Sequence, residues 1–104
     1  MITELQIIGQ KYAVEWVKAY SVDGFSVLAG NCDSTKGMIK VALFDQDGAF
    51  RCNDAIRITF LHEIIEAINY HLQLKLEHDN IDRFASALLQ TLTQVDITDI
   101  KVVK

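Results

Sequence analysis

The sequence predicts a single α+β domain, in which a small antiparallel or mixed β-sheet of three to four strands is followed by two packed α-helices. Residues 1–50 contain short apolar runs, rich in β-branched and aromatic residues, between glycine-containing turns. Residues 53–94 contain no glycine and repeat their apolar side chains at helical spacing. Residues 95–104 are expected to form a tail or an edge strand, and no repeat or linker divides residues 1–104 into further domains.

The first half of the chain predicts a β-hairpin and two further short strands. Residues 5–8 and 12–20 form two apolar runs separated by Gly9-Gln10, which is typical of a hairpin with a short turn. Beyond residue 20, a third and a fourth strand are expected at residues 25–28 and 38–44, with a cluster of turn-forming residues between them at 30–37.

The second half predicts two helices. Residues 53–76 carry the 3.6-residue repeat, with Asn53 or Asp54 as the expected cap. Asp79 is the expected N-cap of the second helix, along which apolar residues recur at helical spacing: Ile81, Phe84, Ala85, Leu88, Leu89 and Leu92. The link over residues 73–78 is short, so the two helices should pack as antiparallel or steeply crossed neighbours.

Composition and charge exclude several classes of protein. The 104 residues are half apolar, include no proline and carry a formal charge of −4, from ten Lys and Arg against fourteen Asp and Glu. Because the basic residues are scattered, no nucleic acid is expected as a main partner. No apolar run reaches the roughly 18 residues of a membrane span, and no secretory signal begins the chain, so we expect a soluble cytoplasmic protein. Cys32 and Cys52 are too few for a disulfide framework.

The first predicted helix has a narrow polar stripe on an otherwise apolar surface. On a helical wheel, roughly two-thirds of the circumference of residues 59–73 is apolar, interrupted only by His71. Such a helix should be buried on most sides, with its polar stripe lining a cleft or groove. The stripe contains Thr59, His62, Glu63, Glu66, Asn69, Tyr70 and Gln73.

Within this stripe, residues 62–66 read His-Glu-Ile-Ile-Glu, an HExxE pattern. His62 and Glu66 lie one helical turn apart on the same side, so they can bind one metal ion together. Glu63 lies about 100° further round, the position from which the glutamate of an HExxH zinc peptidase takes a proton from water. Without a metal, His62 and Glu66 would be an ordinary (i, i+4) pair beside solvent and Glu63 a surface carboxylate.

His78 is the best candidate for a third ligand. A catalytic zinc typically has three protein ligands, commonly two histidines and one carboxylate, and His78 at the entrance of the second helix would complete that set. Asp82, one turn further, is the alternative, and would favour manganese or magnesium. His71 points from the opposite, apolar arc and is expected at the edge of the core or at the surface.

The chain resembles the small phage- and prophage-borne metallopeptidases of the zincin type, over most of its length. Its segments are similar to the opening hairpin, glycine-aspartate turn, following strand, active-site helix and second helix of that family: Ile7-Ile8-Gly9 with Tyr12 and Val14, Gly30 to Asp33, Met38 to Val41, Ile58 to Asn69, and His78 with Ile81, Ala85, Leu88 and Leu92. Most members have HExxH, and this chain departs from that pattern at Glu66, as one branch also does. The resemblance implies a minimal zincin-like fold, ligands His62, Glu66 and His78, and Glu63 as the base.

Together these observations predict a zinc-dependent peptidase-like protein of phage or prophage origin, working in the host-cell cytoplasm on a protein or peptide substrate. The alternative is an inactive binding module of the same fold, which binds a partner protein and keeps a structural metal, with Asp82 as a fourth ligand, or no metal at all. An extended peptide would pair with an edge strand, for which we expect the strand ending near Phe44. Tyr70 is the candidate for stabilising an oxyanion, and the sequence does not indicate an oligomeric state.

Overall fold

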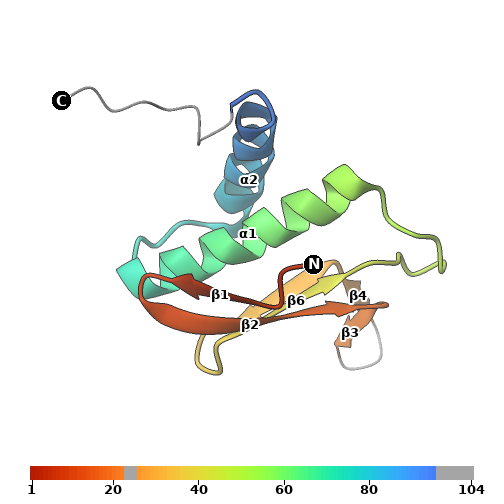
Figure 1. The fold of residues 1–104 in the computed structure, drawn as a ribbon, viewed down its shortest axis with the longest axis horizontal. Helices are drawn as coiled ribbons and strands as arrows, with labels where there is room; N and C mark the ends of the chain where they lie inside the picture. Colours follow the sequence, from red (N-terminus) through yellow and green to blue (C-terminus); the bar gives the residue numbers. More distant parts are fainter. Residues whose placement is uncertain (23–25, 96–104) are drawn as a thin grey trace.

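The computed structural model describes residues 1–22 and 26–95; for residues 20–22 and 26–28 it describes the backbone alone. It contains a four-stranded mixed sheet followed by two helices (Figure 1), which confirms the predicted α+β class. The sheet has the strand order β1 (Glu4–Ile7), β2 (Gln10–Val17), β6 (Met38–Ala42) and β5 (Gly30–Asp33), and the helices are α1 (Asn53–Leu72) and α2 (His78–Leu92). A separate two-stranded hairpin is formed by β3 (Tyr20–Val22) and β4 (Ser26–Leu28).

The predicted N-terminal hairpin is present. β1 and β2 pair antiparallel, with Ile7 opposite Gln10, so the connecting loop consists of Ile8 and Gly9. Both loop residues have positive φ angles, 49° and 74°, the backbone twist that suits a two-residue hairpin turn. β2 then runs parallel to β6, and β5 pairs antiparallel with the other side of β6.

Two expectations about the strands are corrected by this topology. The cluster of turn-forming residues at 30–37 begins with strand β5, because pairing with β6 outweighs the weak strand propensity of Gly30 to Asp33. β6, the strand ending near Phe44, lies between β2 and β5, so neither of its edges can accept an added peptide strand. Among the described strands, the edge beside the helices belongs to β5.

The helix boundaries also differ from the predicted ones. Neither Asn53, Asp54 nor Asp79 is an N-cap: Cys52 and Glu77 occupy these positions, and neither makes a side-chain cap hydrogen bond. α1 ends at residue 72 instead of 76, because Gln73 turns into the left-handed region with φ 52°. The side chain of Asn69 then binds the backbone of Leu76 at both its N–H and its C=O, which fixes the link to α2. Of the predicted tail at residues 95–104, residues 96–104 lie outside the described residues.

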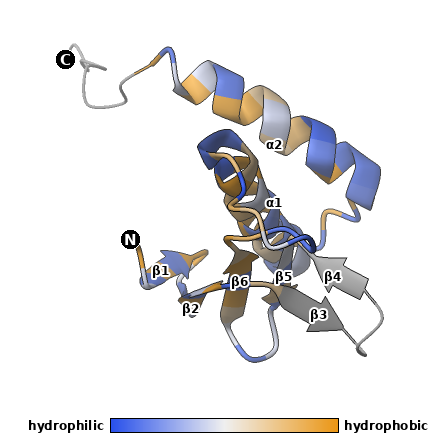
Figure 2. Ribbon diagram, turned by 90° about the vertical axis from the view of Figure 1, so that its right-hand side faces the viewer, coloured by the Kyte–Doolittle hydropathy of each residue, from blue (hydrophilic) through white to orange (hydrophobic). Residues whose placement is uncertain are grey.

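α1 is the middle layer of the molecule. Figure 2 shows the sheet on one side of α1 and α2 on the opposite side. The main core is between the sheet and α1, and its buried members are Ile7, Tyr12, Val14, Ile39, Val41, Ile56 and Ala67. A smaller core between α1 and α2 contains Ile65, Ile81 and Ala85. Coverage on two sides explains the wide apolar arc of α1, and the polar stripe lies in the remaining gap. No helix among the described residues is both long and apolar enough to cross a bilayer.

Replacing Ile81 tests whether α2 depends on this small core. Ile81 is fully buried, whereas Phe84 on the same helix is 59% exposed. We expect Ile81→Ala to lower the free energy of unfolding by about 2 to 5 kcal/mol. Phe84→Ala should change it by less than about 0.5 kcal/mol. Urea denaturation followed by circular dichroism measures both, and equal losses would contradict the described docking of α2.

Candidate metal centre

The polar stripe of α1 faces β5 and the first turn of α2. His62 and Glu63 are each only 7% exposed, and Glu66 is half-buried. A cleft of about 180 Å³ opens at this point, and it is lined by Ala29, Gly30, Ile58, Thr59, His62, Glu63, His78 and Asp82. The sequence therefore predicted correctly that the stripe lines a cleft.

The structure brings the three predicted ligands together. His62, Glu66 and His78 each offer one ligand atom, and these three atoms all lie within 4.8 Å of one another. Three atoms with this spacing share a point no more than about 2.8 Å from each of them (4.8 Å divided by √3). Zinc binds nitrogen and oxygen ligands at about 2.0–2.2 Å, so side-chain movements of less than about 1 Å bring all three into bonding range. The three residues therefore fit a metal ion, and their geometry does not select the element.

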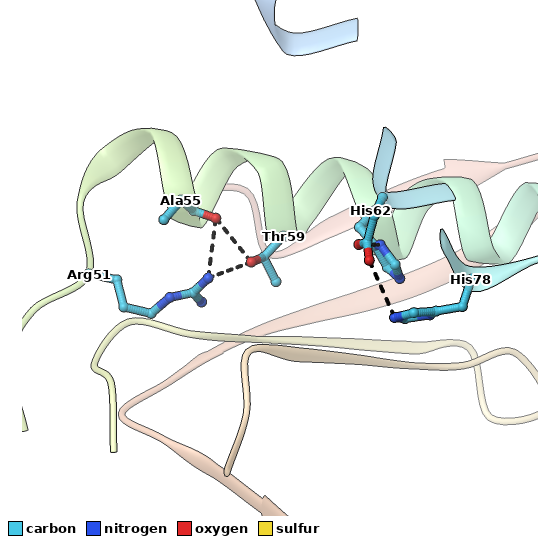
Figure 3. A network of polar contacts seen from close by, with 6 residues as sticks. Arg51, Ala55, Thr59, His62 and His78 are labelled. Atoms are coloured by element: carbon cyan, nitrogen blue, oxygen red, sulfur yellow. Dashed lines mark hydrogen bonds and ion pairs between the residues drawn. The ribbon is translucent and has the colours of Figure 1, made fainter. Parts of the chain in front are cut away.

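Asp82 contacts both imidazoles of this cluster. Its Oδ1 lies 2.7 Å from Nδ1 of His62, and its Oδ2 lies 3.6 Å from Nε2 of His78. The two imidazole rings lie next to each other (Figure 3), with 4.6 Å between their centroids and an edge-to-face arrangement. When Nδ1 of a neutral His62 donates its proton to Asp82, Nε2 keeps a free lone pair, which is the usual arrangement of a metal-ligating histidine with a carboxylate behind it. Asp82 thus orients His62 in the described geometry.

Glu63 is a buried carboxyl group without a hydrogen-bond donor among the described residues. Burial, followed by the negative charges of Glu66 and Asp82, raises the pKa of the Glu63 carboxyl from 4.5 to about 8. No fully enclosed side-chain oxygen or nitrogen in the described part of the chain lacks a partner, so the Glu63 oxygens still reach the cleft. Glu63 is therefore available to a molecule bound in the cleft.

Gly30 makes this burial possible. A Cβ atom at residue 30 would lie 2.6 Å from Cγ2 of Thr59, 2.9 Å from Oε2 of Glu63 and 3.1 Å from the backbone oxygen of Lys40. Any larger residue at position 30 would require Thr59 and Glu63, or β5 itself, to shift. Gly30 lies in a run of turn-forming residues, and nothing in the sequence around it indicates this close approach.

Arg51 fixes the same region from the other side. Its guanidinium group donates hydrogen bonds to the backbone oxygens of Ala29 and Ala42. It also donates hydrogen bonds to the hydroxyl of Thr59 and the backbone oxygen of Ala55 on α1 (Figure 3). One side chain therefore ties the start of α1 to the segment before β5 and to the end of β6. Nothing in the local sequence distinguishes Arg51 from an ordinary charged residue before a helix.

Two other candidates lie apart from the cluster. Nε2 of His71 is 2.7 Å from the hydroxyl of the fully buried Tyr12, so His71 belongs to the edge of the core, as expected. Tyr70 is 54% exposed and lines a second cavity, beyond Glu66. This places the phenol of Tyr70 outside the cleft that contains Glu63.

The second cavity has a volume of about 560 Å³ and follows the first one along the same two elements. It is lined by Asn31, Cys32, Asp33, Ser34, Glu66, Asn69 and Tyr70. Burial raises the pKa of the Cys32 thiol, a hydrogen bond with Ser34 opposes this, and the charges of Glu63, Glu66 and Asp33 raise it again. The two cavities share no lining residue, and Glu66 lines one while His62 and His78 line the other; we refer to them together as the groove.

No family model, curated protein or solved structure matches the chain. The candidate centre therefore rests on the geometry of its own residues.

The raised pKa of Glu63 predicts a pH dependence of the metal-free protein. Between pH 4.5 and about 8 the folded state holds a proton on Glu63 that the unfolded state has released, so the free energy of unfolding should fall as the pH rises. Glu63→Gln has no proton to release, and it should gain about 3 to 5 kcal/mol over the wild type across that window. Urea denaturation with a chelator present, at pH 5 and pH 8.5, measures this, and a constant difference between the two proteins would contradict it.

Proposed function

We propose that this chain is a small metal-dependent peptidase-like protein of phage or prophage origin, with zinc held by His62, Glu66 and His78. Two imidazoles and one carboxylate are a common ligand set of catalytic zinc, and the spacing of the three ligand atoms fits it. The resemblance to zincin-type metallopeptidases agrees with the same three positions.

The observation that carries the proposal is the state of Glu63. A carboxyl group that is 7% exposed and accepts no hydrogen bond from a described residue is costly to the fold. Structural carboxylates are normally buried together with donors, whereas Glu63 stands beside three possible metal ligands and reaches a cleft. Such a group is typical of a general base that acts on a molecule bound in the cleft.

In the proposed reaction, Glu63 moves the proton. A divalent ion held by His62, Glu66 and His78 would supply a Lewis acid, which polarises a peptide carbonyl and makes water more acidic. Glu63 would accept a proton at a carboxyl oxygen as the water oxygen bonds to the carbonyl carbon, and would pass that proton to the amine nitrogen as the C–N bond breaks. Its pKa of about 8 without an ion falls when a cation lies beside it, which favours the ionised form that a base needs. Because Glu66 adds a negative charge to the ligand set, slow or restricted turnover is expected.

The groove fits an extended peptide. β5 is the last strand of the described sheet on this side, and it pairs only with β6 in that sheet, so its other edge is open to a peptide strand. A peptide lying along β5 would pass both cavities, with the ligand cluster near its middle. This replaces β6 as the candidate peptide-binding strand.

A second function is favoured by the contacts of Asp82. Its carboxylate reaches both histidines, so a small rotation would make it a fourth ligand and close the ligand set. A closed set is typical of a structural metal, and the protein would then be a binding module for a partner protein. The number of protein ligands on the ion separates the two functions.

Metal content tests the shared part of both functions. We expect chelator-free protein, after incubation with zinc, to bind about one equivalent, and His62→Ala to bind less than about a tenth. His71→Ala is the matched control and should keep the ion, because His71 lies against Tyr12. Glu63→Gln should keep the ion and lose peptide hydrolysis. If elemental analysis finds no metal in the wild-type protein, both proposed functions are contradicted. If Glu63→Gln still hydrolyses peptides, Glu63 is not the general base.

Cobalt substitution separates an orienting Asp82 from a ligating one. If Asp82 only orients His62, Asp82→Asn should leave the visible spectrum of the Co²⁺ protein unchanged while weakening Co²⁺ binding about 10- to 100-fold. If Asp82 is a ligand, its removal should change the intensity and position of the bands as the coordination changes. Asp79→Asn, which changes an exposed aspartate three residues earlier on the same helix, is the control and should alter neither quantity.

A further inference from the structure

We propose that the larger cavity of the groove is a specificity pocket for a basic side chain, lysine or arginine, of the peptide substrate. This inference rests on the proposed peptidase function and names the class of residue that its substrate carries next to the reacting bond.

The position of the cavity makes it a side-chain pocket. Glu66 belongs both to the ligand cluster and to the cavity wall, so the cavity begins where the ion would sit. It continues along β5 to Asp33, three residues beyond Gly30, or about 10 Å along the strand. Its volume of about 560 Å³ exceeds that of any single side chain. A long side chain anchored beside the ion can therefore extend to Asp33.

The lining of the cavity selects the charge. Asp33 and Glu66 contribute carboxyl groups, the other polar residues are neutral, and none of the residues lining either cavity is lysine or arginine. Hydrogen bonds from the Thr35 hydroxyl and the Lys36 backbone N–H lower the pKa of Asp33, which keeps it ionised. Both of these bonds end on Oδ1, so Oδ2 remains available to a ligand.

The negative charge survives metal binding. Asp33, Glu63, Glu66 and Asp82 place four carboxyl groups along the groove, and a divalent ion offsets two charges. Asp33 lies at the end of the cavity away from the ligands on α2. Asp33 also lines a third cavity, which it shares with Lys36 and Lys40, and the charge of Lys36 contributes to the lowered pKa of Asp33. An acidic side chain would meet the carboxyl groups of Asp33 and Glu66, and an apolar one would offer them no hydrogen-bond donor.

Small metal-binding probes test this pocket without requiring turnover. A hydroxamate group chelates zinc, so Nα-acetyl-lysine hydroxamate and Nα-acetyl-norleucine hydroxamate both anchor on the ion and differ only in the terminal ammonium group. Calorimetry on the zinc-loaded protein at low ionic strength should find the lysine compound bound about tenfold more tightly. Added salt should reduce this advantage.

Two matched variants assign the advantage to Asp33. Asp33→Asn keeps an oxygen for the bonds from Thr35 and Lys36, so the turn should fold, and the advantage of lysine should fall to about twofold or less. Asp47→Asn removes one charge on an exposed turn outside the groove and should leave the advantage unchanged.

The outcomes distinguish the two levels of the proposal. Equal binding of the two compounds to the wild type overturns the specificity pocket and leaves the metal site intact. A lysine advantage that survives in Asp33→Asn, or disappears in Asp47→Asn, overturns the role of Asp33. If neither hydroxamate binds the zinc-loaded protein, the proposed open metal site itself fails, and the pocket assignment fails with it.

Discussion

The close approach of β5 to α1 at Gly30 is the contact on which the rest of the site depends. The space where a Cβ atom would lie is already occupied by Thr59, Glu63 and a backbone oxygen. The two shortest distances, 2.6 Å to Thr59 and 2.9 Å to Glu63, require these side chains or β5 to shift if a Cβ atom is added. With glycine in place, β5 becomes one wall of the groove and α1 the other. The same contact removes Glu63 from bulk water, which is the first cause of its raised pKa.

Charge is concentrated in this part of a small molecule. The negative charges of Glu66 and Asp82 contribute to the raised pKa of the Glu63 carboxyl. The charges of Glu63, Glu66 and Asp33 contribute to the raised pKa of the Cys32 thiol, so the acidic groups along the groove repel one another. Asp33 accepts hydrogen bonds from Thr35 and Lys36, and the carboxyl group of Asp82 lies beside the imidazoles of His62 and His78. Glu63 accepts no hydrogen bond from the described residues. The repulsion is the physical reason to expect that a cation is favoured there.

The parts of this structure that the sequence predicted are those with a local cause. The periodicity of α1, its buried character, the N-terminal hairpin and the meeting of His62, Glu66 and His78 follow from spacing along the chain or from one short link. β5 was missed because its residues favour turns, and only pairing with β6 makes them a strand. The helix caps were misplaced because Cys52 and Glu77 make no side-chain cap bond that a pattern could reveal. Arg51 and Gly30 act across the chain, through contacts that have no sequence signature.

The docking of α2 has a thermodynamic consequence. Among the described elements α2 packs chiefly on α1, through a small apolar contact, and it begins at His78, with Asp82 one turn further along. The candidate ligands are thus divided between the two helices, so an ion bound by all three residues also cross-links α1 to α2. Affinity for the ion and closure of the helix pair are then two sides of one equilibrium, in which RT ln(1 + [ion]/Kd) is added to the stability of the closed form. The concentration of free metal in the surroundings would set how firmly this protein holds its second helix.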